Sequence, residues 1–439
     1  MKKRQWLIMV LMIALSLPTW ATDGYFSLGY NTRHKGIAGA GIGYYYTSII
    51  GGNPAGRVYL GTMYDVNIGL FSPIRQYSVI GAPSMLPNTF GLLPGTIESG
   101  TEYFIVPAIG ANWAFSEKSA LGLSIYGNGG MNTDYSTATF FDESSSSTGV
   151  NLSQLFAELS YAYEFAKGQS LGISGVAGYQ MFEAKGLNAF GQFGLSSDAT
   201  KLSNNDMDNA FGLGFKMGYL GKISDQISVG ATYQSKIFMS EFKDYAGLFA
   251  EEGDFDIPSW WAVGVTYSPI EDLTLIADFK QIMYSGAKSV SNPMNPQNLF
   301  PAFLKPGGDP NNPSDYQQNP NFKPLGSENG AGFGWEDMSV VKFGAEYAGV
   351  ENWIFRGGYS YGKQPIPDSE VLFNILAPGI IEHHIALGFS RNIGQGNTQL
   401  HISLNYALNN KVSGVNPLDP VQSIDLEMKQ FDVQVGISF

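Results

Sequence analysis

Apolar and polar residues alternate along many stretches of this 439-residue chain, with the two-residue period of a β-strand. The clearest stretch is 400–409, where the apolar even positions would face one way and the odd positions, from His401 to Asn409, the other. Stretches 261–268 and 341–347 show the same pattern, with mostly small residues on the less apolar side. Such strands are typical of a transmembrane barrel, but a soluble two-sheet sandwich gives a similar pattern.

The connections between the predicted strands distinguish these two folds. Fourteen strands are predicted, at 57–72, 101–115, 118–129, 149–166, 170–187, 208–224, 227–243, 258–269, 273–288, 337–351, 352–367, 383–394, 398–414 and 425–439. Tight turns such as 116–118, 167–169 and 224–226 follow the even-numbered strands, and longer loops follow the odd-numbered ones. A bacterial outer-membrane barrel requires this alternation, whereas a sandwich does not. The prediction is an all-β fold, a transmembrane antiparallel β-barrel of about 14 strands with both termini periplasmic.

The last segment alternates up to the final residue of the chain. Its apolar positions are Phe431, Val433, Val435, Ile437 and Phe439. A terminal strand that ends on an aromatic residue resembles the signal that the barrel-assembly machinery reads in outer-membrane proteins. We therefore expect that machinery to be a partner during biogenesis.

The N-terminus and the composition agree with export to the outer membrane of a Gram-negative cell. Residues 1–21 combine three basic residues, an apolar run and a small-x-small site at 19–21, which predicts a signal peptide. Its removal would change the formal charge from −13 to −16, which argues against a nucleic-acid partner. Only 14% of the residues are charged, against about 25% in a soluble protein, and there is no cysteine. No cofactor is expected.

The longest connection, 289–336, is rich in Pro, Asn and Gly and is expected to be an irregular external loop. Its Asp309 and Asp315 lack the spacing of a calcium loop, so we expect solvated loop residues and no metal.

Residues 22–56, between the signal peptide and the first predicted strand, do not alternate and are dense in glycine. A fourteen-stranded barrel leaves a lumen that its own side chains cannot fill, and a compact Gly-rich segment is suited to pack there. The predicted domains are therefore a signal peptide (1–21), an N-terminal plug or hatch (22–56) and the barrel (57–439).

Several sequence blocks resemble the long-chain fatty-acid and aromatic-hydrocarbon uptake family (FadL/TodX type). In the plug they are Gly24-Tyr25-Phe26, residues 36–41 and the motif Asn53-Pro54-Ala55-Gly56; later blocks are 212–220, 228–235, 332–337, 355–359 and 365–367. The resemblance covers nearly the whole mature chain. It implies passive uptake of a hydrophobic small molecule through an internal apolar pocket, with lateral exit into outer-membrane lipid at a kink in the third strand.

Two sets of residues are candidates for the transport path. Gly127, Gly129 and Gly130 fall at the upper part of the predicted third strand, where glycines mark a bulge or a close backbone approach. They are candidates for the lateral opening, although a flexible start of an external loop would look the same. A fatty-acid carboxylate would also need a cation. By alternation the lumen-facing candidates are Lys236, Lys280, Lys342 and Arg356, each of which could instead pair with Glu346, Asp278 or Glu158.

Other functions remain open at this point. Long-chain fatty acids are the first ligand hypothesis, and monoaromatic hydrocarbons are the alternative. A general diffusion porin is disfavoured by the plug, while a structural or adhesive barrel is not excluded. Catalysis is not expected: His401 and Ser403 share one face, but that face points to the lumen and no third partner is evident. Aromatic residues such as Tyr44–Tyr46, Tyr245 and Phe249 could line the pocket or only pack the plug. Lateral delivery works in a monomer, which we expect.

Overall fold

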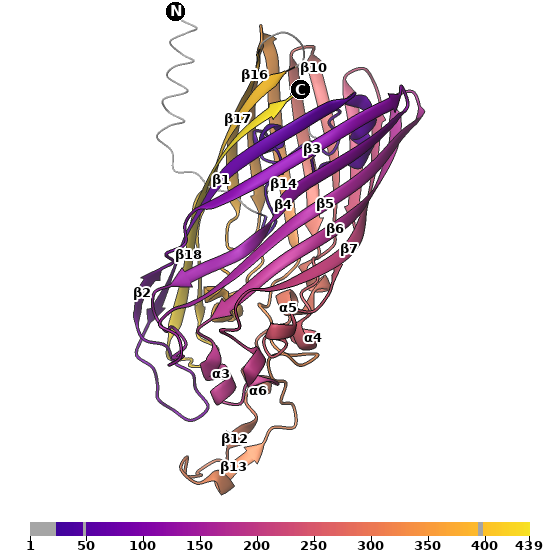
Figure 1. Ribbon diagram of the computed structural model, residues 1–439. Coiled ribbons are helices and arrows are strands. Elements are labelled where there is room, and N and C mark those ends of the chain that lie inside the picture. Colours follow the sequence, from indigo (N-terminus) through magenta and orange to yellow (C-terminus); the bar gives the residue numbers. More distant parts are fainter. Residues whose placement is uncertain (1–22, 47–49, 394–397) are drawn as a thin grey trace, which may run out of the picture.

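The computed structural model describes residues 23–46, 50–393 and 398–439, so the predicted signal peptide lies outside the described residues. Fourteen antiparallel strands form a closed, tilted barrel (Figure 1). They are β1 (Met63–Ile80), β3 (Phe104–Ser116), β4 (Ser119–Tyr135), β5 (Thr148–Ala166), β6 (Gln169–Lys185), β7 (Asp208–Lys222), β8 (Ile227–Gln234), β10 (Trp260–Ile270), β11 (Leu273–Ile282), β14 (Met338–Val350), β15 (Trp353–Gly362), β16 (His383–Asn392), β17 (Gln399–Val415) and β18 (Ser423–Ser438). Each strand pairs with the next of this series, and β18 pairs with β1 along 65–80, which closes the sheet.

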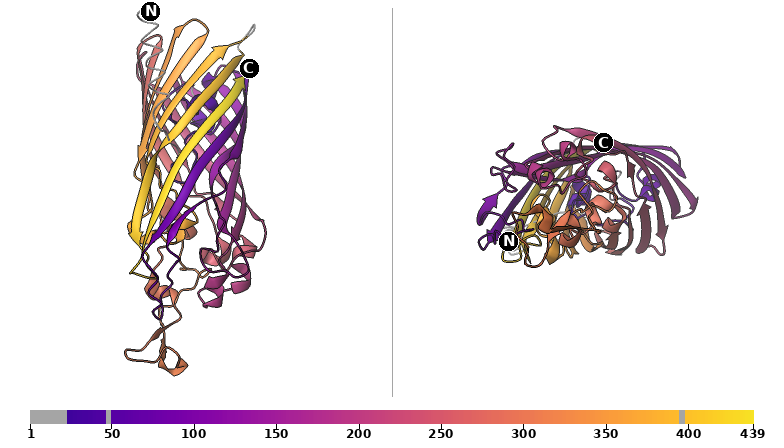
Figure 2. Two further views of the ribbon diagram at one scale, coloured as in Figure 1. Left: turned by 90° about the vertical axis from the view of Figure 1, so that its left-hand side faces the viewer. Right: turned by 90° about the horizontal axis from the view of Figure 1, so that it is seen from below.

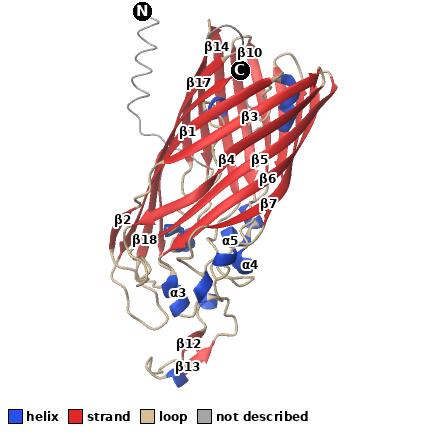
Figure 3. Cartoon of the chain, viewed as in Figure 1, coloured by secondary structure: helices blue, strands red, loops and turns tan. Residues whose placement is uncertain are grey.

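The two ends of the barrel differ (Figure 2). At one end, which also holds the C-terminus, tight turns connect β3 to β4, β5 to β6 and β7 to β8. At the other end lie the long loops with most of the short elements (Figure 3). The short strands are β2 (Gly95–Glu98) beside β1, β9 (Phe238–Met239) beside β7, and the pair β12 (Ala302–Leu304) and β13 (Tyr316–Gln318). The helices of these loops are α3 (Asn188–Gln192), η2 (Ala199–Lys201), η3 (Lys243–Tyr245), α4 (Ala250–Gly253), η4 (Tyr284–Gly286), α5 (Lys288–Ser291), α6 (Pro296–Leu299), η5 (Pro313–Asp315), η6 (Asp368–Glu370) and η7 (Phe373–Ile375).

The predicted two faces of the strands are observed. Trp261, Val263 and Val265 are exposed on the outer surface of β10, while Ala262 between them is buried. On β18 the apolar positions Phe431, Val433, Val435 and Ile437 face outward and alternate with buried polar or small residues, and Phe439 directly after the strand is exposed as well. Among the described residues, no helix has the length and apolar character needed to cross a membrane.

The structure corrects four details of the sequence prediction. The first strand was predicted at 57–72 but is Met63–Ile80, because Asn53 caps a 3₁₀-helix, η1 (Pro54–Tyr59), that stays inside the barrel. The seventh barrel strand was predicted at 227–243 but ends at Gln234. Asn409 was predicted to face the lumen but is exposed, because a β-bulge between Ala407 and Asn410 reverses the alternation. The 289–336 connection carries short helices and the β12–β13 pair, so it is not wholly irregular.

Candidate functional site

The predicted plug fills the lumen and is anchored through its Asn53-Pro54-Ala55-Gly56 motif. The Asn53 side chain donates hydrogen bonds to the backbone oxygens of Ile42 (3.0 Å) and Tyr219 (2.8 Å). A Cβ added at Gly172 would lie 2.4 Å from Pro54, and one at Gly218 would lie 1.9 Å from the Asn53 side chain. The wall glycines therefore let the motif lie directly against β6 and β7.

A second anchor holds the middle of the plug, which includes the helix α2 (Thr32–Lys35). The carboxylate of Asp278 on β11 accepts hydrogen bonds from the backbone N–H groups of Gly41 (2.6 Å) and Ile42 (3.0 Å). Near them, a Cβ at Gly230 would lie 2.0 Å from the Ile42 carbonyl oxygen, so the plug backbone contacts the wall without side chains between.

The first described residues of the plug, 23–28, are held by a buried charge cluster. We call this segment the plug tip. The carboxylate of Asp23, fully buried, lies 2.9 Å from the Lys342 ammonium and 3.3 Å from that of Lys280. Burial raises the pKa of Asp23, but the two lysine charges outweigh this effect and hold the pKa at about 2. The tip is therefore tied to β11 and β14 by ionic contacts at neutral pH.

We expect Asp23→Asn to destabilise the protein, because it leaves two buried lysines without their counter-charge. The expected loss is about 3 kcal/mol in the free energy of unfolding, measured by denaturant titration in detergent micelles. Asp225→Asn, at an exposed turn carboxylate, is the matched control and should leave the stability unchanged. Since the pKa of Asp23 is lowered, its contribution should be complete above pH about 4 and lost as the pH falls towards 2. Equal stability of the two variants at neutral pH would contradict this role.

The barrel wall is interrupted between β3 and β4, beside the plug tip. The pairing between these two strands begins with Ser116 opposite Ser119 and ends with Ala108 opposite Tyr126. Beyond this point residues 104–107 of β3 pair with β1 and not with β4. β4 continues alongside β5, with single bridges from Gly129 to Phe26 of the plug and from Tyr135 to Ser99. Further along, Gly100 donates from its backbone N–H to the Asp134 carbonyl oxygen (2.7 Å), which reconnects the wall. We call the region between 104–107 and 127–132 the wall gap.

The three glycines singled out from the sequence lie at the wall gap. The β4–β5 register shifts between Gly127 and Gly129, because Asn128 is an extra residue in β4. Such a bulge bends its strand and breaks the pairing with a neighbour. The plug tip lies against the bulge: Ser27 donates to the Asn128 carbonyl oxygen (2.7 Å), and Gly130 donates to that of Tyr25 (3.2 Å). A Cβ at Gly129 would lie 1.8 Å from the Tyr25 carbonyl oxygen, so the tip requires glycine there.

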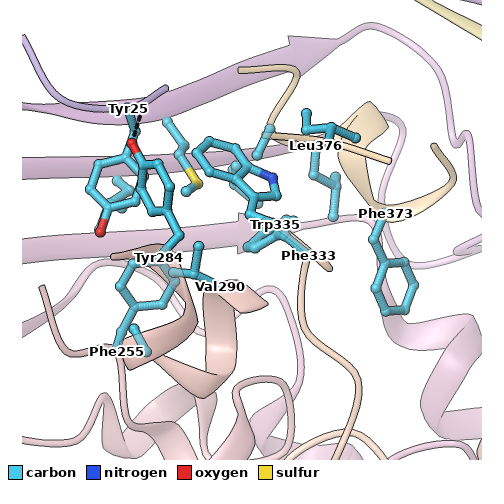
Figure 4. Packing of buried hydrophobic residues seen from close by; sticks show 14 of the residues in the cluster. Tyr25, Phe255, Tyr284, Val290, Phe333, Trp335, Phe373 and Leu376 are labelled. Carbon is cyan, nitrogen blue, oxygen red and sulfur yellow. Dashed lines mark hydrogen bonds between the residues drawn. The ribbon is translucent and has the colours of Figure 1, made fainter. Parts of the chain in front are cut away.

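A cavity of about 410 Å³ adjoins the wall gap, and residues from both faces of the barrel line it. Its inner lining includes Tyr25 of the plug tip and Trp335 of the loop before β14, whose rings lie 5.8 Å apart (Figure 4). Its outer lining includes Ile105, which is 72% exposed, and Leu155 on the outer face of β5. Most lining residues are apolar, so the lumen is connected to the outer surface by a largely apolar cavity.

The four cations predicted from the sequence do not line this cavity. Lys280 and Lys342 bind Asp23, and Arg356 binds Glu346 (2.6 Å), one of the pairings that the sequence left open. Lys236 was predicted to face the lumen, but it lies beyond the end of β8, is 31% exposed and pairs with Asp256. None of the four therefore contacts a ligand bound in this cavity, and a role as carboxylate contacts elsewhere in the lumen stays a prediction.

Two other cations line the cavity, Lys35 and Arg75, and the sequence analysis did not single them out. Arg75 lies on the inner face of β1, but the predicted first strand ended at residue 72. Extending the alternation of this strand to residue 80 would have identified Arg75. Lys35 lies in the plug, where no periodic pattern gives the direction of a side chain.

The remaining candidate residues do not line the larger cavity. Tyr245 and Phe249 are buried in an aromatic cluster with Phe182, and Phe249 also lines a second, much smaller cavity. Tyr44 donates to Glu346 (2.5 Å) and packs the plug. His401 faces the lumen, as predicted, and bonds the hydroxyls of Ser390 and Ser438. Over the described part of the chain, no group of acidic or histidine residues has the arrangement of a metal site.

The closed barrel, its apolar outer surface and its plug-filled lumen define a transmembrane β-barrel channel with an occluded lumen. The family model of outer membrane transport proteins (OMPP1/FadL/TodX) matches residues 93–419, 327 of 439 residues, and the chain belongs to this family. It is therefore an outer-membrane β-barrel of a Gram-negative family that transports hydrophobic compounds.

Solved structures with this fold include channels for hydrophobic molecules. The Pseudomonas putida toluene transporter TodX has a TM-score of 0.66 at 16% identity, with 94% of this chain and 98% of that chain covered. A Pseudomonas aeruginosa FadL homologue has a TM-score of 0.64 at 13% identity, covering 95% and 99%. The Ralstonia pickettii toluene transporter TbuX has a TM-score of 0.56 at 16% identity, with 93% of this chain and 98% of that chain covered. No curated protein matches the sequence. At these identities the likeness concerns the fold.

Proposed function

We propose that this protein is a passive uptake channel, not an enzyme, whose ligands are long-chain fatty acids and leave sideways through the wall gap. The observation that carries the proposal is the cavity beside residues 127–130, which joins the lumen to the lipid-facing surface. Its volume of about 410 Å³ lies within the range of about 300–1,000 Å³ typical of small-molecule sites.

A lateral route suits a hydrophobic ligand for a simple energetic reason. Apolar surface prefers apolar surroundings by about 25 cal/mol per Å², so a long alkyl chain would cross a water-filled pore poorly. An apolar cavity that opens to lipid spares the ligand an aqueous step. In this scheme Gly127, Gly129 and Gly130 form the lateral opening, the plug blocks the direct path along the barrel axis, and a monomer suffices.

The proposed orientation places the C-terminus and the tight turns in the periplasm, with the long loops outside the cell. Short periplasmic turns and long external loops are the rule for bacterial barrels. The alternating terminal strand that ends at Phe439 would then be the signal for the barrel-assembly machinery.

Monoaromatic hydrocarbons are the second candidate, and one observation favours them. Solved structures with this fold include those of toluene transporters and of a monoaromatic hydrocarbon channel. A general diffusion porin is disfavoured because the plug fills the lumen, and an adhesive barrel would not need the cavity.

The test is uptake of labelled oleate and labelled toluene by cells that lack their own fatty-acid channel, with and without this protein. We expect oleate uptake to rise at least tenfold with the protein, because the cavity accepts an alkyl chain and delivers it to lipid. Uptake of toluene but not of oleate would contradict the fatty-acid proposal and identify the ligands as neutral hydrocarbons. Uptake of neither would contradict a channel for hydrophobic compounds.

A further inference from the structure

The charged residues of the cavity do not cancel one another. Three of them line it: Lys35, Arg75 and Asp432. The Lys35 ammonium lies 2.6 Å from the Asp432 carboxylate, and both side chains are buried, so these two charges neutralise each other. The charge of Arg75 is left over, which gives the cavity lining a net charge of +1.

The Arg75 guanidinium is surrounded by backbone carbonyl dipoles and the Phe104 ring, and the Glu102 carboxylate attracts it only from beyond ion-pair distance. The residue is 3% exposed, and its two terminal nitrogens donate to the carbonyl oxygens of Thr101 and Asn132. Its Nε is buried and has no hydrogen-bond partner in the protein. Within the described ranges no carboxylate forms an ion pair with Arg75, and this includes the neighbouring Glu102.

Most other buried cations of the lumen differ from Arg75. Each of Lys216, Lys280, Lys342 and Arg356 has a carboxylate partner within 3.3 Å. Among the described residues Arg57, on the plug helix η1, also forms no ion pair, but it does not line the cavity. A buried charge without a partner is costly, and guanidinium binds carboxylates in a planar, two-pronged geometry. The guanidinium without an ion pair in a largely apolar cavity is therefore complementary to a ligand with an apolar body and an anionic group.

The position of Arg75 also fixes how such a ligand would lie. Thr101 precedes β3 and Asn132 belongs to β4, so the guanidinium bridges the wall gap at its end nearer the long loops. Gly127 and Val106 lie at the other end, where a Cβ on the glycine would be 3.1 Å from the valine. An anionic group at Arg75 leaves the apolar lining of the gap for the alkyl chain.

We propose that Arg75 binds the carboxylate of an amphipathic ligand and thereby determines that the channel prefers fatty acids to neutral hydrocarbons of the same length. The inference rests on the proposed function, because it assumes that the cavity is the ligand site. The carboxylate fills the position of the missing counter-ion, and the alkyl chain lies along the wall gap towards the outer face.

The experiment compares two ligands that differ in the headgroup alone, labelled oleate and labelled oleyl alcohol. Equilibrium binding is measured on the mature protein in lipid nanodiscs, with empty nanodiscs subtracted. The wild type should bind oleate about tenfold or more tightly than the alcohol, since a hydrogen-bonded charge pair contributes at least that factor. Arg75→Gln should lose this preference and keep its affinity for oleyl alcohol, which also reports that the cavity is intact.

Two further variants complete the test. Arg75→Lys retains the charge and should retain most of the preference. Lys236→Gln removes a cation outside the cavity and should bind like the wild type; loss of the preference there would assign it to overall charge and overturn the inference. If Arg75→Gln fails to bind either ligand, the Arg75→Lys variant provides the test instead. An Arg75→Lys variant that binds oleyl alcohol but does not prefer oleate overturns the inference.

The outcomes separate this inference from the proposed function. Equal binding of both ligands by the wild type, or a preference that survives in Arg75→Gln, overturns the role of Arg75 and leaves a hydrophobic channel standing. Binding of neither ligand by the wild type overturns the proposed function and the inference with it.

Discussion

Deletion of residues 22–52 should convert the protein into an open pore. The deleted segment includes the plug tip, helix α2 and the backbone that Asp278 binds, so the lumen loses its main filling. Lys280, Lys342 and Asp278 would then face an open lumen in which water replaces their plug partners. We expect permeability to a small sugar to rise by at least an order of magnitude in a liposome-swelling assay, and ligand-selective uptake to be abolished, because a barrel of this strand number has a wide lumen.

The barrel itself should survive this deletion, because the closing β1–β18 pairing does not involve the plug. Heat-modifiable migration on gels provides the check that the barrel is folded. Asp225→Asn, which changes only an exposed turn, should leave permeability at the wild-type level. Sugar permeability that stays unchanged in a folded deletion variant would show that residues 22–52 do not block the pore.

Deletion of Asn128 should close the wall gap and stop uptake. Gly127 pairs with Leu155 and Gly129 with Gln154, so Asn128 is the one residue of β4 without a counterpart in β5. Its removal makes this ladder regular, and β4 can continue alongside β3 beyond Tyr126. We expect oleate uptake by cells to fall at least tenfold, because the lateral path through the wall gap is closed.

Asn128→Ala is the matched control, because it keeps the bulge and removes only the side-chain hydrogen bonds to Tyr30 (2.9 Å) and Gln154 (2.8 Å). It should retain most of the uptake. Normal uptake by the folded deletion variant would refute lateral exit at this position, and a similar loss in both variants would assign the effect to the asparagine side chain.

The predicted and observed strands agree best where the pattern is local. Alternation over 261–268 and 341–347 gave both the strands and their outward faces, because the side-chain direction in a strand depends only on the residue count. Two of the errors occur where this count changes. At Asn409 a bulge adds a residue, and at 57–62 a helix inside the barrel replaces the expected start of β1.

The candidate site was predictable only in part. The glycines at 127–130 marked an irregular strand because glycine signals a bulge or a close approach in any context. Nothing in the sequence indicated that Tyr25 of the plug contacts this point, or that Asp23 neutralises Lys280, which is 257 positions away. Alternation places a lysine in the lumen but does not reveal its partner.

The sequence by itself determined the all-β class, the number of barrel strands, the inner and outer faces and the presence of a plug segment. The first three depend on interactions within one strand or between strands adjacent in the chain, and short-range patterns record them. The plug segment was recognisable because it is rich in glycine and does not alternate. Only the tertiary structure decided where the plug tip lies, that the wall opens beside it, and that Arg75 remains unpaired in the cavity. These features depend on which charges and backbone groups from distant segments meet inside the barrel, and that is settled by packing in three dimensions.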